Sequence, residues 1–455
     1  MLIIDDLNEE NVQAWKIFFT RLPLKIFMQE RIKILVIGSG GREHAIVKEC
    51  IKSPLTSEVI AAPGNGGMSQ DARCLPVDVS DPSAIAKLAK NEAVDFAIIG
   101  PEVPLCAGAV NQLEDEGITT FGPNKKAARF EGSKTYTKDF LAKYKIPTAR
   151  YGNFSEVKPA LEYLGTYPEI GRIVVKASGL AAGKGVLIAE NRAEAGQFVR
   201  DILENRQFGK SGDEIVIEEF MEGRETSLHL LVSGKQFAVL PTSRDHKKIG
   251  EGETGPNTGG MGVIAPDPTI PTRILEEIIE NIAKPTLSAF QSEEIDYRGI
   301  LYIGLILTTE GPKVLEFNVR LGDPETQLIL PLFKEDTVEV FLAAARGNSL
   351  SKYLTPTGQS AITVVLAANG YPDQYETGVP ITLDVNLPEG VDVIHAGTKL
   401  DSNGILETSG GRVLNIVAKA DNAAKAFDKV YSACNHRYFD GQYFRKDIGK
   451  PVPTP

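Results

Sequence analysis

The chain has few cysteines, no long apolar run and no excess of positive charge. Its four cysteines are scattered among 455 residues and none belongs to a Cys-x-x-Cys pair, so their spacing supports neither a zinc site nor a disulfide framework. No apolar run reaches the ~18–20 residues that cross a bilayer, and the net charge of −11 argues against a general nucleic-acid or anionic-membrane surface. We therefore expect a cytoplasmic protein that binds neither nucleic acid nor membranes.

The length of 455 residues is enough for roughly three domains. The content of 42% hydrophobic and 24% charged residues is typical of a globular protein. Residues 1–31 stand apart, because acidic residues precede the apolar-basic stretch Trp15–Phe27, an order found in neither a signal peptide nor a transit peptide. We interpret them as an N-terminal extension without function, with a partner-binding amphipathic helix as the alternative.

Residues 32–132 alternate between predicted strands and helices. The strands fall at 31–38, 58–62 and 94–100, and the helices at 43–51 and 82–91. This alternation is typical of a doubly wound parallel α/β sheet, in which ligands bind beyond the carboxyl ends of the strands. All three strands run into glycine-rich or charged turns, so a site is predicted at that edge.

Residues 133–335 predict an α+β domain and residues 359–450 a smaller α/β domain. In the first, strands are expected at 172–177, 186–189, 214–220 and 299–309, a hairpin at 227–232 and 236–240, and helices at 193–205 and 271–291. Residues 244–262 are predicted to form one long glycine-rich loop, and such loops are usually functional. In the second, strands are expected at 361–368, 392–395 and 412–418, and a helix at 421–434.

A polar face is predicted on the strand that begins at Leu315. Successive side chains of a strand point to opposite faces, so Glu316, Asn318 and Arg320 share one of them. Such a face is costly against a dry core. It suits a cleft for Mg²⁺ and phosphate, because Mg²⁺ takes oxygen ligands and shares them with substrate phosphates. A solvated sheet face with an incidental ion pair is the alternative, and these residues alone do not decide between the two.

Two glycine-rich turns predict phosphate binding. Gly38–His44 opens a helix whose N–H groups form an anion site, but Glu43 stands where a dinucleotide fingerprint has its third glycine. A loop for a phosphorylated sugar fits better, and a plain tight turn is the alternative. Residues 178–185 lack the first glycine and the final Ser or Thr of a P-loop. We interpret them as a hairpin loop that closes over phosphates beside Lys176, although a surface lysine is the alternative for Lys176 alone.

Together these motifs resemble the ATP-grasp superfamily and, within it, the glycinamide ribonucleotide synthetase family. The matching segments follow the family's order over about residues 32–450. They are ILVIGSGGREHA (34–45), APGN (62–65), GPEVPL (100–105), EGSKTYTKDFL (131–141), VVKASGLAAGKGV (174–186), residues 245–262, residues 315–327, HAGT (395–398), GGRVL (410–414) and RKDIG (445–449).

The resemblance implies a central ATP-grasp domain with two α+β lobes and a defined reaction. ATP, glycine and 5-phosphoribosylamine would give ADP, phosphate and glycinamide ribonucleotide, a step of de novo purine synthesis. The glycine carboxylate would attack the γ-phosphate, and the sugar amine would then displace phosphate from glycyl phosphate. Phosphoryl transfer rests mostly on positioning and charge neutralisation, which agrees with the lack of a recognisable catalytic triad.

The resemblance also implies roles for individual residues. ATP would be held by the lysines at its phosphates, the hinge at adenine and an acid at the ribose, within the set Lys134, Lys176, Gly183, Glu218, Glu219, Met221 and Glu225. Mg²⁺ or Mn²⁺ would bind Glu316 and Asn318. Catalytic roles are implied for Arg320, Lys176 and Asp245. The substrates would contact Gly40, Gly41, Asn65, Pro101, Glu102, Asp245, Asn257, Thr258, Gly259, Arg320, Asp323 and Pro324.

Two rival functions remain at this stage. The first is another ATP-grasp carboxylate–amine ligase or a carboxylase, which would differ in the first domain and in the 245–262 loop. The second is a non-catalytic nucleotide-binding protein, which the presence of Glu316, Asn318 and both lysines argues against. Transient contact with neighbouring enzymes of the purine pathway is a further expectation.

Overall fold

The first unit of the fold is a parallel sheet. The structure is a computed structural model that describes residues 31–181, 184–351, 354–383 and 386–450, so residues 1–30 of the predicted extension lie outside the described residues. The sheet has the order β3-β2-β1-β4-β5, and the doubly wound prediction is confirmed. Because the order reverses between β1 and β4, a ligand crevice is expected beyond their carboxyl ends. The elements are β1 (Ile32–Gly38), α2 (Gly41–Lys52), β2 (Thr56–Pro63), α3 (Met68–Asp71), β3 (Arg73–Cys74), α4 (Pro82–Asn91), β4 (Phe96–Ile99), α5 (Glu102–Ala107), α6 (Ala109–Asp115) and β5 (Thr119–Phe121).

Helix α4 shows how the sequence sets an element of this unit. The Asp81 side chain caps the helix by accepting hydrogen bonds from the backbone N–H groups of Ser83 and Ala84. Pro82 occupies the first helical position, where its missing N–H costs nothing. The helix then buries Ile85, Ala86 and Ala89 in the core that covers the sheet.

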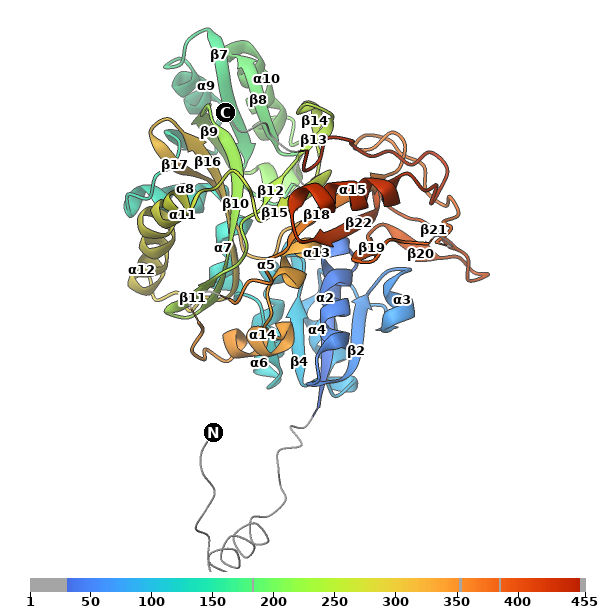
Figure 1. Ribbon diagram of the computed structural model, residues 1–455. Coiled ribbons are helices and arrows are strands. Elements are labelled where there is room, and N and C mark those ends of the chain that lie inside the picture. The colour runs from blue at the N-terminus through green and yellow to red at the C-terminus, as the bar shows by residue number, and fades with distance from the viewer. Residues whose placement is uncertain (1–30, 182–183, 352–353, 384–385, 451–455) are drawn as a thin grey trace, which may run out of the picture.

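The central part contains two antiparallel sheets. One has the order β6-β9-β7-β8, and the other β11-β10-β16-β17. Figure 1 shows the first sheet and its helices α9 and α10 at the top of the molecule, away from the N-terminal sheet. The elements are α7 (Lys125–Gly132), α8 (Lys134–Lys143), β6 (Tyr151–Phe154), α9 (Val157–Leu164), β7 (Ile170–Ala177), β8 (Val186–Asn191), α10 (Arg192–Leu203), a 3-10 turn (Gly209–Gly212), β9 (Ile215–Glu219), β10 (Arg224–Ser233), β11 (Gln236–Val239), β16 (Arg298–Thr308) and β17 (Gly311–Asn318).

The helix predicted over 271–291 is interrupted. The chain forms α11 (Thr272–Ile278), a π-helical turn (Ile279–Ala283) and α12 (Lys284–Ser292). Pro285 lies in the first turn of α12 and has no N–H to donate to the preceding turn. The wider π turn sits directly before it, so the periodic pattern continues while the hydrogen-bond ladder changes.

The C-terminal sheet takes strands from two distant parts of the chain. Its order is β12-β15-β18-β22-β19 and its pairings are antiparallel. The strand β12 (Arg244–Asp245) and the hairpin of β13 (Lys248–Gly250) and β14 (Thr254–Asn257) fall within the segment predicted as a long loop, and β15 (Gly262–Ala265) begins at its last residue. The prediction of a loop without regular structure was therefore wrong. Such short, glycine-containing strands carry too little periodic pattern to be recognised locally.

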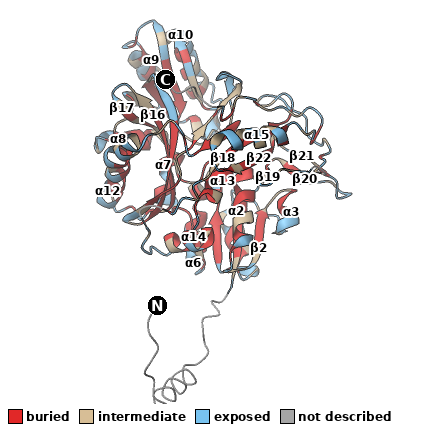
Figure 2. Ribbon diagram, in the orientation of Figure 1, coloured by how far each residue is buried: buried red, intermediate tan, exposed pale blue. Residues whose placement is uncertain are grey.

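The remaining elements complete the C-terminal part. They are α13 (Thr326–Ile329), a 3-10 turn (Leu330–Leu332), α14 (Thr337–Ala345), β18 (Ser360–Ala367), β19 (Val391–His395), β20 (Thr398–Leu400), β21 (Leu406–Thr408), β22 (Arg412–Ala420) and α15 (Ala423–Cys434). Figure 2 shows buried strands through the middle of each unit and exposed outer helix faces. Among the described residues, no helix is both long enough and apolar enough to cross a membrane.

His229 predicts an acid-dependent loss of stability. Its ring is fully buried in β10, packs edge-on against Tyr302, and accepts a hydrogen bond from the Gly322 N–H. Burial lowers the pKa of His229 to about 3, whereas an unfolded histidine titrates near ~6.5. Between these values the unfolded state binds more protons, so the free energy of unfolding rises with pH. This one group should cost about 2 kcal/mol on acidification to about pH 5.

Urea denaturation at neutral and acid pH measures this effect. The His229→Gln variant should lose less stability than the wild type over the same interval, because glutamine does not titrate. Equal losses in the two proteins would rule out His229 as a source of the acid sensitivity.

Candidate active site

Two lysines and a glutamate meet between the N-terminal turn of α8 and the first central sheet. Lys176 on β7 and Lys138 on α8 each contact the carboxylate of Glu218 on β9, at 2.9 and 3.0 Å. Lys134 stands one helical turn before Lys138 and donates to the Gly179 carbonyl at 3.3 Å. Burial and the neighbouring Lys176 lower the pKa of Lys138 to about 8, against the opposing effect of Glu218. The buried group has an excess of positive charge, which suits the phosphates of a nucleotide.

Lys138 is a functional candidate that the sequence reasoning missed. It follows Lys134 by four residues, and side chains at this spacing lie on the same face of a helix. That spacing was the available signal. The structure therefore adds Lys138 behind Glu218, while Gly183 of the predicted nucleotide set lies outside the described residues.

The chain passes between the two central sheets at the end of β9. Glu219 accepts a hydrogen bond from the Arg150 N–H and donates its own N–H to the Arg150 carbonyl. Met221 is half-buried in the connection, and Glu225 is exposed near the start of β10. Of these predicted nucleotide residues, Glu219 ends β9 and Glu225 lies in β10, whereas Met221 lies on the link between the two lobes.

Glu316 and Asn318 share one face of β17, as predicted, but the strand ends at Asn318, so Arg320 lies beyond it rather than on the same strand face. The Asn318 amide donates to Glu316 Oε1 at 3.4 Å, and Lys247 Nζ lies 3.8 Å from the same oxygen. Burial alone would raise the pKa of Glu316, but Lys247, Lys176 and Lys134 together hold it at about 2. Within the part of the chain that the structure describes, no cluster of three or more His, Cys, Asp or Glu side chains could hold a metal ion. One carboxylate and one amide fit a Mg²⁺ ion that takes its other ligands from phosphates and water.

Arg320 is fixed by two acids from the N-terminal side of the fold. Its Nη2 donates to Glu131 Oε1 at 2.8 Å, and its Nε lies 3.4 Å from Glu102 Oε2. Although burial favours the neutral acid, Arg320 keeps the pKa of Glu102 below its ordinary value. The pairing places the Arg320 guanidinium close to Pro101 and Glu102, which begin α5. Arg320 therefore links the end of β17 to the first domain.

Asp245 is half-buried, with its Oδ1 buried, and it lies near the buried Glu325. Burial and the charge of Glu325 raise the pKa of Asp245 well above its ordinary value, against the opposing effect of Lys247. Among the described residues, Asp245 Oδ1 has no hydrogen-bond partner. A buried orphan oxygen of this kind is costly unless something binds it. Asp245 and Glu325 could accept hydrogen bonds from a ligand ammonium group.

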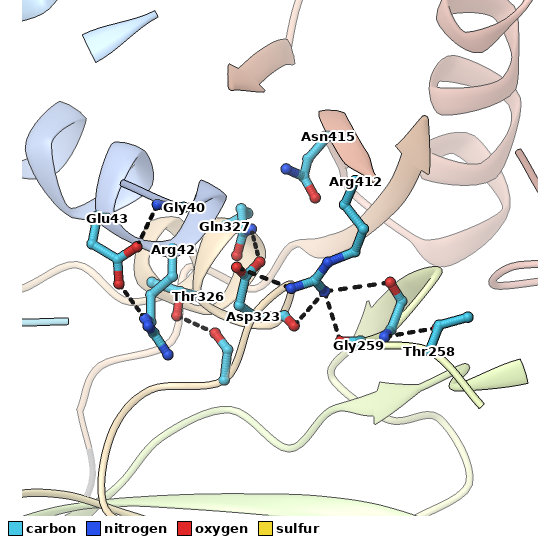
Figure 3. A network of polar contacts seen from close by, with 12 residues as sticks. Gly40, Arg42, Glu43, Thr258, Gly259, Asp323, Thr326, Gln327, Arg412 and Asn415 are labelled. Atoms are coloured by element: carbon cyan, nitrogen blue, oxygen red, sulfur yellow. Dashed lines mark hydrogen bonds and ion pairs between the residues drawn. The ribbon is translucent and has the colours of Figure 1, made fainter. Parts of the chain in front are cut away.

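The glycine turn of the first domain is largely occupied by protein contacts. Gly40 N–H donates to Glu43 Oε2 at 2.7 Å, and Arg42 Nε donates to Glu43 Oε1. A side chain at position 41 would meet Gln327 and Asn415 at 2.6 Å, so Gly41 allows close packing of α2. Figure 3 shows this group beside Asp323.

Asn65 is likewise engaged by the backbone of neighbouring segments. Its Nδ2 donates to the carbonyls of Ser39 and His395, and its Oδ1 accepts from the N–H groups of Gly67 and Met68. The side chain therefore holds the first and C-terminal domains together at this edge.

A cavity of about 410 Å³ lies between these two domains. One side is formed by the turns after β1 and β2, and the other by residues of the C-terminal domain. Its lining is Ser39, Gly40, Pro63, Gly64, Asp323, Tyr371, Ala396, Gly397, Ser409 and Arg412. A wider groove of about 690 Å³ beside α9 and α10 contains none of the predicted site residues. The cavity, at the carboxyl edge of the parallel sheet, is where a sugar substrate would be expected.

The 257–259 segment borders this cavity. Thr258 donates through both its N–H and its hydroxyl to the Lys247 carbonyl, and Gly259 N–H donates to the Tyr371 hydroxyl. Asn257 is exposed at the end of β14, and Pro324 is buried beside Gly260. Sequence reasoning did not assign Tyr371, Arg412 or Lys247, although Lys247 and Arg412 lie within the quoted motifs.

Family models match the chain in three consecutive stretches. They are phosphoribosylglycinamide synthetase N domain at residues 32–131, its ATP-grasp (A) domain at 132–326 and its C domain at 361–451.

Curated relatives match over nearly the same length. Phosphoribosylamine–glycine ligase of Escherichia coli (strain K12) is 44% identical over 423 residues, covering 92% of this chain and 98% of the relative. The ligase of Chlorobaculum tepidum is 43% identical over 423 residues, covering 92% and 99%. A bifunctional purine biosynthetic protein of Pichia angusta is 44% identical over 425 residues, and this chain spans only 54% of it.

Solved structures agree with the sequence matches. Phosphoribosylamine–glycine ligase of Thermotoga maritima superposes with a TM-score of 0.80 at 35% identity, covering 91% of this chain and 100% of the other. Biotin carboxylase of Campylobacter jejuni has a TM-score of 0.71 at 14% identity, covering 92% and 94%, which indicates a shared fold alone. With three domain models and relatives at this level of identity, the chain belongs to the phosphoribosylglycinamide synthetase family.

Proposed function

We propose that this protein joins glycine to 5-phosphoribosylamine at the expense of ATP, as a step of purine biosynthesis. The products are glycinamide ribonucleotide, ADP and phosphate. One observation carries the proposal: a chain that matches all three family domains holds the lysines beside Glu218, the polar face of β17, and the cavity between the first and C-terminal domains. The relatives named phosphoribosylamine–glycine ligase support the same reaction.

The nucleotide is assigned to the space between the two central sheets. Lys134 and Lys176 bind its phosphates, the backbone at Glu219 and Met221 reads adenine, and Glu225 contacts the ribose. Glu218 sets the position of Lys176 through their 2.9 Å contact. Gly183, which lies outside the described residues, keeps its assignment to the nucleotide as part of this proposal.

The metal is assigned to Glu316 and Asn318. A bound Mg²⁺ or Mn²⁺ neutralises phosphate charge during phosphoryl transfer. The side chains of the site hold the reacting groups in place. They also exclude water, which would otherwise hydrolyse the acyl phosphate.

Glycine is assigned to the region between Asp245 and β17. Asp245 accepts a hydrogen bond from the glycine ammonium, and Arg320 steadies the carboxylate and the acyl phosphate. Asn257, Thr258 and Gly259 border this site. A carboxylate oxygen of glycine attacks the γ-phosphorus of ATP, and the bond to ADP breaks.

The sugar amine is assigned to the cavity of about 410 Å³. Gly40 and Asp323 line this cavity. We assign Gly41, Asn65, Pro101, Glu102 and Pro324 to the substrate side around it. The amine nitrogen attacks the acyl carbon of glycyl phosphate, phosphate leaves, and the nitrogen loses a proton. Catalytic roles fall to Arg320, Lys176 and Asp245.

The same proposal sets the cellular context. We place the protein in the cytoplasm, which agrees with its four free cysteines, and assign it small-molecule substrates rather than nucleic acid or membrane. Transient contact with neighbouring enzymes of the pathway belongs to this proposal.

Phosphate release provides the test. Purified protein is mixed with ATP, Mg²⁺, glycine and freshly generated phosphoribosylamine, and each component is omitted in turn. Sustained release should require all four, and mass spectrometry should detect glycinamide ribonucleotide. Turnover with another acid or amine but not with this pair would keep the ATP-grasp chemistry and refute the substrate assignment. Replacing Mg²⁺ by Mn²⁺ in the same assay tests which metal supports turnover.

A further inference from the structure

Two motifs of the C-terminal domain, GGRVL and RKDIG, have no assigned part in the reaction. Each contains an arginine, Arg412 or Arg445, whose side chain contacts the segment 246–260. This segment contains the hairpin β13–β14, which Figure 1 shows beside the C-terminal domain. Two arginines of the C-terminal domain therefore contact a segment that lies more than a hundred residues earlier in the chain.

The buried Arg445 guanidinium bonds to the hairpin and to Asp447. Its side chain is 1% exposed. Its Nη1 donates to the Lys248 carbonyl at 2.9 Å, its Nη2 to Glu253 Oε1 at 2.8 Å, and its Nε and Nη2 to the two oxygens of Asp447 at 2.8 Å. A buried guanidinium with these partners is strongly oriented. It has no face toward the cavity and is therefore unsuited to bind substrate.

Two residues close to Arg445 in sequence, Asp447 and Tyr443, also bond to the hairpin. Asp447 Oδ2 also accepts from the Gly252 N–H at 2.8 Å, and the Tyr443 hydroxyl donates to the Ile249 carbonyl at 2.8 Å. The C-terminal segment 443–447 thus contacts both β13 and the turn that follows it. The C-terminal segment therefore holds β13 and the following turn at several points rather than at one.

Arg412 holds the other end of the segment. Its Nη1 donates to the carbonyls of Gly259 at 2.6 Å and Asp323 at 2.7 Å, with a longer contact to Gly260 at 3.4 Å. Its Nη2 lies 3.2 Å from Asp323 Oδ2. Figure 3 shows the guanidinium between the 258–259 backbone and Asp323. Arg412 therefore connects residues 259–260 to Asp323, which follows β17 in the chain.

The base of the hairpin lies at the reaction site. Thr258 on one arm donates to the Lys247 carbonyl on the other at 2.8 Å, through its N–H and its hydroxyl. The Lys247 side chain then extends to within 3.8 Å of Glu316 Oε1. Any shift of the hairpin moves Lys247 and Thr258 relative to Glu316.

We propose that Arg445 is a positioning residue for the ligation, with Arg412 as the second anchor. From the C-terminal domain the two arginines fix both arms of the 246–260 segment, and so hold Lys247 and Thr258 beside the Glu316 site. The proposal rests on the proposed ligase function, and it gives the C-terminal domain a part in placing glycine. Among the described residues, the Arg445 side chain bonds to Lys248, Glu253 and Asp447 and not to β7, β9 or α8, which form the nucleotide site.

Steady-state kinetics of Arg445→Met tests the proposal in the full-length protein. The KM for glycine should rise by about tenfold or more, since small displacements of positioning groups have effects of this size, while the KM for ATP rises much less. Hydrogen exchange in residues 248–257 should become faster. Arg437→Ala is the matched control, because this arginine of the same domain is 76% exposed and pairs only with Asp440 in the described residues; it should match the wild type.

Glu253→Gln keeps the test open if Arg445→Met does not fold. The Glu253 side chain is 54% exposed, so its replacement does not threaten the core, and it should raise the KM for glycine in the same selective way but by less. A wild-type KM for glycine in the folded variants would overturn the proposal, as would equal rises in the KM values for glycine and ATP. Wild-type protein that makes no glycinamide ribonucleotide would instead refute the proposed function.

Discussion

Replacing Glu316 by alanine should lower kcat by about 10³-fold, the scale seen when a group that stabilises transition-state charge is removed. Glu316 is the only carboxylate of the polar face of β17 and lies opposite three lysines. Without it, a metal ion would keep only the Asn318 amide as a side-chain ligand from this face. The lysines would still attract phosphate, so ATP binding should survive better than turnover. Initial rates at increasing Mg²⁺ concentration measure the loss.

Glu310→Ala is the control for this variant. Glu310 lies just before β17, is exposed, and pairs with Lys313 at its surface, so its loss should leave the rate unchanged. Circular dichroism and the unfolding midpoint of Glu316→Ala should match those of the wild type. A Glu316→Ala enzyme with near-normal Mg²⁺-dependent activity would refute the metal assignment.

Replacing Lys176 by methionine should lower kcat/KM for ATP by about 10²–10³-fold. Methionine keeps much of the side-chain bulk and removes the ammonium group that lies 2.9 Å from Glu218. The glutamate then keeps Lys138 as its neighbour at 3.0 Å, so the buried carboxylate does not lose all its counter-charge. The variant should fold, and the loss should appear with ATP as the varied substrate.

Lys158→Met provides the comparison, because Lys158 is exposed on α9 of the same lobe. It should retain wild-type kcat/KM. If Lys176→Met also retained it, the phosphate-binding role of Lys176 would be wrong. Titration of a fluorescent ATP analogue would separate weaker binding from slower chemistry.

The first domain could be predicted well because its information is local. The helix predicted at 82–91 coincides with α4, whose cap, first proline and apolar spacing all lie within that stretch. The three predicted strands of this domain form β1, β2 and β4, although each end shifts by up to two residues. Their parallel order follows from the strand–helix alternation. The shared face of Glu316 and Asn318 was predictable for the same reason, since it needs only the two-residue period of a strand.

The parts that escaped prediction depend on contacts between distant segments. β15 exists because Val263 and its neighbours pair with β18, about a hundred residues later, and nothing within four residues of sequence announces such a partner. The contact between Lys138 and Glu218 forms only because β9 brings Glu218 to α8. Arg445 looks like any basic residue until the hairpin surrounds it. Family motifs marked these arginines but could not say what they touch.

The exchange of strands between the central and C-terminal parts has a consequence for dissecting the protein. Cutting the chain near residue 355 would not yield two self-contained pieces. The N-terminal fragment would keep β12 and β15 without their neighbour β18, and the C-terminal fragment would expose the edge of β18. Unpaired strand edges of this kind favour aggregation. Residues 244–265 and 360–450 should therefore fold and unfold as one cooperative unit, and complementation by two separately expressed halves would require them to assemble through a newly formed sheet.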